Sequence, residues 1–140
     1  MNKRTRARRA ALQALYQWQM TAQPAHAITG EFIEEERLAK LDRELFDGIL
    51  NGVINRVEEL DGALAPHLDR DIADIDPVER AVLRLGAFEL MCSLEVPWRV
   101  VVNESVELAH AFGAEKGHRF VNGVLDKVAR DLRAMEMRAR

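Results

Sequence analysis

Apolar residues recur along most of the chain at intervals of three and four, the spacing of α-helices that each bury one face. The clearest run follows a spacing of four residues and contains Leu41, Leu45, Ile49, Val53 and Val57. No segment shows the sustained alternation of apolar and polar residues that marks a half-buried strand. The pattern therefore predicts an all-α protein built as a helical bundle.

Prolines and capping residues set the expected limits of these helices. Pro24 and Pro66 end two apolar runs, because proline removes a backbone donor and breaks a helix interior. Asp76 and Pro77 suit the N-cap and first position of another helix. The predicted helices cover about 3–22, 30–39, 41–65, 77–92, 97–112 and 117–132, and the basic tail 133–140 is expected to fray.

The length of 140 residues suits one domain, residues 1–140, made of two halves that share a core. A run of acidic residues between Asp69 and Asp76 marks the expected boundary, which gives an N-terminal half of about 1–70 and a C-terminal half of about 75–140. Gly48 and Gly52 lie one turn apart inside a predicted helix. Each costs about 1 kcal/mol relative to alanine, so we expect a close helix–helix approach there.

Charge is distributed unevenly along the chain. The first thirty residues hold five cations and no acid, whereas the remainder holds fifteen cations against twenty-three acids. A basic arm on an acidic body points to a polyanionic partner, although a solubilising arm or a mitochondrial transit peptide has a similar composition. Arg4 and Arg8 share a helix side with Leu12, and unpaired arginines are rarely buried. We therefore expect the first turns to overhang the body.

The residues beside these cations favour RNA over other polyanions. Gln13 offers an amide to base edges and Tyr16 offers a ring for stacking, a combination that suits single-stranded RNA. A second basic and aromatic group opens the last predicted helix, where the helix N-terminus favours anions. Tyr16 and Phe120 either stack on RNA or pack in the core. The second group contains Lys116, His118, Arg119 and Phe120.

Residues that could support catalysis or bind a cofactor do not form a recognisable pattern. The four histidines fall in separate segments without metal-ligand spacing, and Cys92 lies in an apolar run typical of a buried side chain. The glycines at 113 and 117 lack the Lys-Ser/Thr of a phosphate-binding loop. We expect no enzyme activity, no metal and no cofactor. The single cysteine and the absence of a 20-residue apolar run predict a cytoplasmic protein without a membrane anchor.

Several motifs resemble the NusB family of bacterial transcription factors. They are the Arg-rich start with residues 11–18 (ALQALYQW), 79–85 (ERAVLRL), 88–90 (FEL), 103–109 (NESVELA), 112–113 (FG) and 119–127 (RFVNGVLDK). The resemblance implies an all-helical fold of two three-helix halves. It also implies a factor that pairs with NusE, a small-subunit ribosomal protein, to bind boxA RNA in nascent transcripts and promote read-through by RNA polymerase.

The resemblance also implies which residues make these contacts. The implied RNA surface is Arg4, Arg6, Arg8, Arg9, Gln13, Tyr16, Lys116, His118, Arg119 and Phe120, and the implied NusE surface is Glu79, Arg80 and Arg84. Family members often carry an acid where this chain has Lys116. Two alternatives remain, an accessory RNA-binding domain related to RNA methyltransferases and a helical module that binds only protein. The sequence is equally compatible with a monomer and a homodimer.

Overall fold

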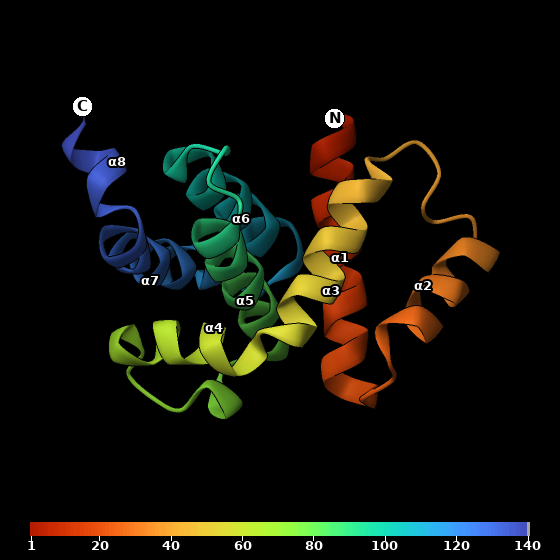
Figure 1. Ribbon diagram of the computed structural model, residues 1–140. Coiled ribbons are helices and arrows are strands. Elements are labelled where there is room, and N and C mark those ends of the chain that lie inside the picture. The colour runs from red at the N-terminus through yellow and green to blue at the C-terminus, as the bar shows by residue number, and fades with distance from the viewer. Residues whose placement is uncertain (140) are drawn as a thin grey trace. The chain divides into compact units, whose positions relative to one another are not determined.

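The computed structural model describes residues 1–139, and every regular element in that range is a helix (Figure 1). The prediction of an all-α protein is confirmed. The chain forms two compact units, residues 1–55 and the residues from Arg56 onward. The change between units therefore comes earlier in the chain than the acidic run at 69–76 suggests. No helix within the described residues combines the length and apolar content needed to cross a membrane.

The first unit consists of three helices, α1 (Lys3–Thr21), α2 (Ala25–Glu34) and α3 (Arg43–Asn55). Helix α1 packs against α3, and α2 contacts both. Two aromatic rings lie at the centre, because Phe32 and Phe46 are fully buried with ring centroids 5.9 Å apart. The other apolar side chains of this unit that are fully or almost fully buried are Ala7, Ala11, Leu12, Ala14, Leu15, Ile28, Ile49, Leu50 and Val53.

Helix α2 begins five residues before its predicted start at residue 30 and also ends earlier than predicted. Pro24 is its N-cap, so this proline begins one helix as well as following another. After α2 the chain turns, and Glu36 and Lys40 adopt left-handed backbone conformations with φ of 56° and 64°. The prediction of a helix over 30–39 is wrong at both ends, because the apolar residues Ile28, Phe32 and Ile33 all lie in α2 and the chain turns directly after it.

The run predicted as one helix from 41 to 65 is two helices in the structure. Helix α3 ends at Asn55, and α4 (Val57–Leu64) begins after Arg56, whose φ of −116° and ψ of 18° are not helical. The apolar spacing continues across Arg56 at the helical period, so the sequence carries no sign of the interruption. A 3₁₀ turn, η1 (Ala65–His67), follows α4 and contains Pro66.

The second unit contains three long helices, a short C-terminal helix and a second 3₁₀ turn in addition to α4. These are η2 (Ile72–Asp74), α5 (Pro77–Cys92), α6 (Trp98–Phe112), α7 (Gly117–Leu132) and α8 (Ala134–Arg138). Helices α5, α6 and α7 pack pairwise, and α4 packs on α5. Helix α5 starts as predicted, because the Asp76 carboxylate accepts hydrogen bonds from the backbone N–H groups of Val78 (2.9 Å) and Glu79 (3.2 Å).

One glycine marks a close approach among the three long helices. A methyl group at Gly86 of α5 would lie 2.6 Å from Cδ1 of Leu125 and 2.9 Å from Oγ of Ser105. Helices α6 and α7 therefore approach the α5 backbone at a point where only hydrogen fits. The close approach predicted at Gly48 is wrong, since that glycine is exposed and has open space around it.

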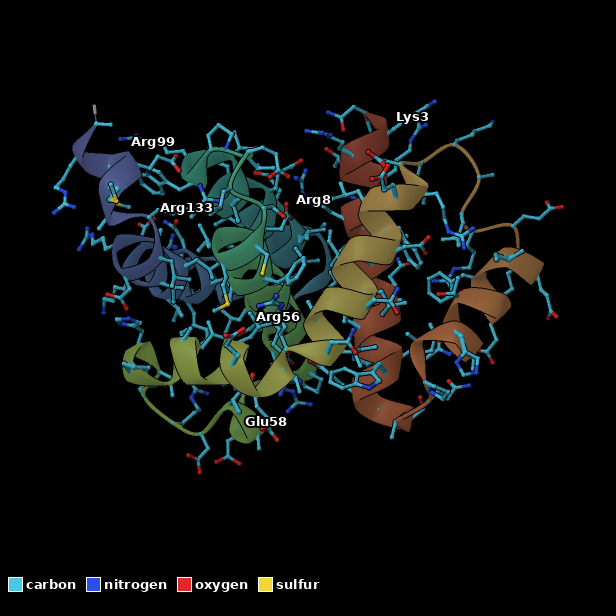
Figure 2. The ribbon with its side chains drawn as sticks, viewed as in Figure 1. Lys3, Arg8, Arg56, Glu58, Arg99 and Arg133 are labelled. Carbon is cyan, nitrogen blue, oxygen red and sulfur yellow. The ribbon has the colours of Figure 1, made fainter. Side chains whose placement is uncertain are left out.

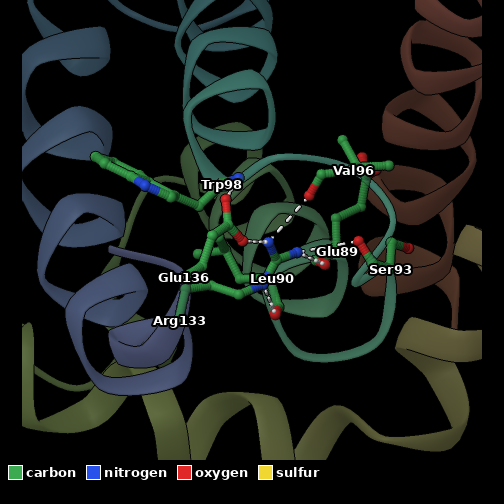
Figure 3. A network of polar contacts seen from close by, with 7 residues as sticks. All are labelled: Glu89, Leu90, Ser93, Val96, Trp98, Arg133 and Glu136. Carbon is green, nitrogen blue, oxygen red and sulfur yellow. Dashed lines mark hydrogen bonds and ion pairs between the residues drawn. The ribbon is translucent and has the colours of Figure 1, made fainter. Parts of the chain in front are cut away.

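A buried arginine ties the C-terminal end of the chain to the end of α5 (Figure 3). Arg133 is 4% exposed and donates to the backbone carbonyls of Leu90 (2.8 Å), Glu89 (3.2 Å), Ser93 (3.0 Å) and Val96 (3.0 Å). It also pairs with Glu136, which accepts a bond from the backbone N–H of Trp98. The expected fraying of the tail is therefore wrong for α8, and Arg140 lies outside the described residues.

Candidate nucleic-acid interface

Helix α1 presents a polar and aromatic face that its own periodicity creates. Arg6, Arg9, Gln13 and Tyr16 follow one another at spacings of three and four, so they lie on one side of the helix. Arg6 and Gln13 are exposed, Tyr16 is 40% exposed, and Arg9 is half-buried. The question of whether Tyr16 belongs to the core is thereby answered, because its ring reaches the surface. We call these four residues the α1 face.

The first turn of α1 does not overhang the unit. Asn2 caps the helix by accepting from the Thr5 N–H at 2.7 Å, and the Asp42 N–H donates to the Lys3 carbonyl at 3.1 Å. Arg6 donates to the Lys40 carbonyl at 3.3 Å. Lys40 and Asp42, just before α3, therefore hold the start of α1 by hydrogen bonds.

The arginines on the other side of α1 differ from each other. Arg4 is exposed and lies 4.0 Å from the Asp42 carboxylate. Arg8, which Figure 2 labels on α1, is by contrast only 3% exposed. The expectation that Arg8 would be solvated is therefore wrong. Helical phase alone places Arg8 beside Leu12 and Leu15, and in the folded protein it follows them into the interior. We leave Arg8 out of the exposed RNA surface.

Two further contacts organise the α1 face. Arg37 donates from Nη2 to Oε1 of Gln13 at 2.7 Å, and its guanidinium lies 3.7 Å from the centre of the Phe32 ring. Gln17, one position beyond Tyr16, donates to Gln23 at 2.8 Å and also to the Glu31 carboxylate of α2. Gln17 therefore joins α1 to α2, while Gln13 stays exposed at the surface.

A second basic and aromatic group lies within the second unit at the start of α7. Lys116 and Arg119 are exposed, and His118 and Phe120 are half-buried. Lys116 precedes the helix in a left-handed conformation with φ of 70°. Its backbone turn brings the chain into α7, whose N-terminal N–H groups favour negative charge.

Residues from other segments complete this second group. The guanidinium of Arg70, in the loop between the two 3₁₀ turns, lies 5.4 Å from the centre of the Phe120 ring, a cation–π distance. The His110 ring of α6 meets the His118 ring edge to face with centroids 5.0 Å apart. We call Arg70, His110, Lys116, His118, Arg119 and Phe120 the α7 group.

Glu79 lies against this group and is not fully exposed. A methyl group at Gly117 would come within 2.5 Å of Oε2 of Glu79, so the carboxylate covers the first residue of α7. Burial raises the pKa of Glu79, repulsion from Asp76 raises it further, and the Arg70 guanidinium acts in the opposite direction. The side chain implied for NusE binding therefore contacts the segment implied for RNA binding.

The two arginines implied for partner binding already have partners inside the second unit. Arg84 makes a two-pronged ion pair with Asp61 of α4, with N–O distances of 2.9 and 2.8 Å, and only 12% of its side chain is exposed. Arg80 is half-buried and donates to the Ala73 carbonyl at 3.1 Å. Arg84, which the resemblance implies for NusE binding, is therefore held inside the second unit, where it joins α4 to α5.

The described residues contain no group of three or more histidines, cysteines or acids that could hold a metal ion. Cys92, expected to be buried in the core, is half-buried at the end of α5. The chemistry available on the α1 face and the α7 group consists of cations, an amide, imidazoles and aromatic rings. Side chains of these kinds contact phosphates and bases in nucleic-acid-binding proteins.

Sequence reasoning missed three residues, Arg37 beside the α1 face and Arg70 and His110 of the α7 group. Each approaches an aromatic ring that is distant in sequence or on another element, so none has a local signal. Arg37 lies in a segment whose helix was predicted with the wrong limits. Arg70 lies among acids, and its Nε donates to Asp69 at 2.9 Å. Because the segment around it has a net negative charge, the charge pattern of the sequence does not indicate a basic surface there.

The fold and these surfaces define a class, an all-helical protein with basic and aromatic surfaces suited to nucleic acid. Residues 5–130 match the model of the NusB family. The transcription antitermination protein NusB of Nitrosococcus oceani is 55% identical over 139 residues, which cover 99% of this chain and 93% of the relative. The chain belongs to the NusB family of transcription antitermination proteins.

Solved structures of NusB proteins have a similar fold. A structure of T. maritima NusB superposes with a TM-score of 0.80 at 26% identity and covers 94% of each chain. A crystal structure of the antitermination factors NusB and NusE in complex with dsRNA gives a TM-score of 0.78 at 27% identity, covering 91% of this chain and 96% of the other.

Proposed function

We propose that this chain binds boxA-like RNA in nascent transcripts together with NusE, and so helps RNA polymerase to read through terminators. The α1 face is the observation that carries the proposal. Four side chains suited to phosphates, base edges and base stacking follow one helical line at the surface. The similar protein crystallised with NusE and dsRNA supports both partners. The chain acts in this proposal by binding in the cytoplasm, without catalysis.

The proposed RNA surface has two parts. In the first unit it consists of the α1 face with Arg4, and in the second unit it consists of the α7 group. Arg8 is omitted because it is buried. Arg84 is likewise omitted from the proposed NusE surface, because its guanidinium is held by Asp61. Glu79 and Arg80 remain in that surface.

Fluorescence anisotropy tests the RNA part of the proposal. The full chain is titrated with a labelled single-stranded boxA-like RNA, a scrambled strand and a duplex, each with and without NusE, at several salt concentrations. The logarithm of the association constant should fall with the logarithm of salt concentration by about 0.7 per phosphate contacted on a single strand. Equal affinity for all three RNAs in the presence of NusE would contradict the boxA assignment.

A matched pair of variants tests the α1 face. Arg6→Ala should weaken binding to every RNA and reduce the salt slope by roughly 0.7 for one lost phosphate contact. Arg43→Ala removes the same charge from α3, where Arg43 pairs with Asp47 at 3.0 Å. It should leave the salt slope unchanged. If both variants gave the same slope as the unaltered protein, the α1 face would not contact the RNA backbone.

Pull-down or calorimetry with purified NusE tests the partner surface. Arg80→Glu should weaken NusE binding while the helical content and the melting temperature stay close to those of the unaltered protein. Arg84→Ala serves as the contrast, because it should lower stability by breaking the pair with Asp61. Normal NusE binding by Arg80→Glu would remove Arg80 from the proposed surface.

A further inference from the structure

The amide of Gln13 is held in one orientation by a donor-only neighbour. Its Oε1 accepts from Nη2 of Arg37 at 2.7 Å, and Gln13 is exposed at the centre of the α1 face. An arginine carries five N–H donors and no acceptor, so only the oxygen of the amide can face it. The NH₂ group of Gln13 therefore points away from Arg37, and we expect a ligand of the α1 face to meet it there.

Arg37 is well placed to maintain this orientation. Its guanidinium lies 3.7 Å from the centre of the Phe32 ring, and Phe32 is fully buried against Phe46. The Arg37 backbone N–H also donates to the Phe32 carbonyl at 2.8 Å. The platform beneath the guanidinium belongs to the core of the first unit, so the donor that orients Gln13 is fixed by packing.

We propose that Arg37 is a positioning residue that makes Gln13 a hydrogen-bond donor toward bases, so that the α1 face selects carbonyl oxygens over amino groups. This inference rests on the proposed RNA-binding function. A free glutamine side chain can present either its oxygen or its NH₂ group, and so accepts both kinds of base edge. With the oxygen held by Arg37, the NH₂ group bonds O4 of uracil and meets only another donor at N4 of cytosine.

The test compares RNAs that differ by a single base, measured on the same protein. Each uridine of the boxA-like strand is replaced in turn by cytidine, and binding of the full chain is measured by anisotropy. At one position the strand with uridine should bind about tenfold more tightly than the strand with cytidine. This ratio is the size expected when one hydrogen bond is replaced by two donors that face each other. Because the result is a ratio within one protein sample, a fraction of inactive protein does not change it.

Three variants identify the source of that preference. Arg37→Met removes the donor, so the ratio of uridine to cytidine affinity at that position should fall toward one. Arg37→Lys keeps a donor-only group beside Oε1 and should preserve most of the preference. Gln13→Glu replaces the NH₂ group with an oxygen while keeping an acceptor toward Arg37, so it should abolish the preference. Arg43→Met controls for the loss of one cation and should retain the ratio.

The outcomes separate this inference from the proposed function. Salt-dependent RNA binding with an unchanged uridine preference in Arg37→Met would overturn the positioning role of Arg37 and leave the RNA-binding proposal intact. The same conclusion follows if no position shows a preference in the unaltered protein. Absence of salt-dependent binding to any RNA would instead contradict the proposed function itself. Circular dichroism melting of each variant confirms that the ratios are measured on folded protein.

Discussion

The carboxylate of Glu79 lies so close to Gly117 that a methyl group there would come within 2.5 Å of Oε2. Glu79 stands in the first turn of α5 and Gly117 is the first residue of α7. The contact therefore joins the starts of two helices within the second unit. It also places an acid beside the cations of the α7 group, where it limits how much negative charge the start of α7 can accept.

The raised pKa of Glu79 predicts a dependence of stability on pH. A raised pKa means that the folded state binds this proton more tightly than the unfolded state, so folding is favoured by protonation and opposed by ionisation. Glu79 should therefore contribute more to the free energy of unfolding as the pH falls through its raised folded pKa.

Glu79→Gln tests this sign. The variant should be slightly more stable than the unaltered protein near neutral pH, and the difference should disappear in mildly acidic buffer, measured by urea unfolding at both pH values. The effect is small because Glu79 is only half-buried. Glu58→Gln, at an exposed position of α4, is the control. If the two variants behaved alike, ionisation of the half-buried Glu79 carboxylate would have no measurable cost in stability.

Gly86→Ala should destabilise the second unit. The added methyl group would meet Leu125 at 2.6 Å and Ser105 at 2.9 Å, so buried side chains must move, at a cost of about 1–3 kcal/mol. Gly48→Ala is the matched control at an exposed position of α3, where nothing lies within 4 Å of the added methyl group, and it should stabilise by about 0.5–1 kcal/mol. Urea unfolding measures both changes. The same sign for both would contradict the close approach at Gly86.

Arg133 should contribute more to stability than any surface arginine. Arg133→Met would remove one donor from each of four backbone carbonyls and from Glu136, and we expect a loss of about 3 kcal/mol or more. Arg133→Lys should recover only part of this, because an ammonium has three donors in place of five. Arg130→Met, at an exposed position of α7, should change stability by less than about 0.5 kcal/mol. Equal losses at positions 130 and 133 in chemical unfolding would refute the role of the buried network.

Arg70→Ala should weaken RNA binding by about fivefold, since it removes a cation that lies over Phe120 in the α7 group. Arg99→Ala is a close control, because Arg99 also lies over an aromatic ring, Trp98, at 5.0 Å, outside the proposed RNA surface. Anisotropy at low and moderate salt should show the loss for Arg70 only. Equal affinities of the two variants would remove Arg70 from the interface.

Residues that act through helical periodicity could be predicted from the sequence, and residues that act through tertiary contacts could not. In α7, Val121, Val124, Leu125 and Val128 recur at helical spacing and are all buried, whereas Phe120 and Leu132 at the two ends of the same line are half-buried. The cap at Asp76 was also correct, because capping is local chemistry. Arg56 was missed, since an interruption that preserves the apolar spacing leaves no trace in the sequence.

The sequence by itself determined an all-α chain and an N-terminal helix with cations on several sides. Only the tertiary structure decided which cations stay exposed. Arg8 is buried and Arg84 is paired with Asp61, while Arg37 and Arg70 approach aromatic rings. The reason is physical: periodicity fixes the direction of a side chain from its helix axis, but the neighbouring elements decide whether that direction leads to solvent, an acid or a ring.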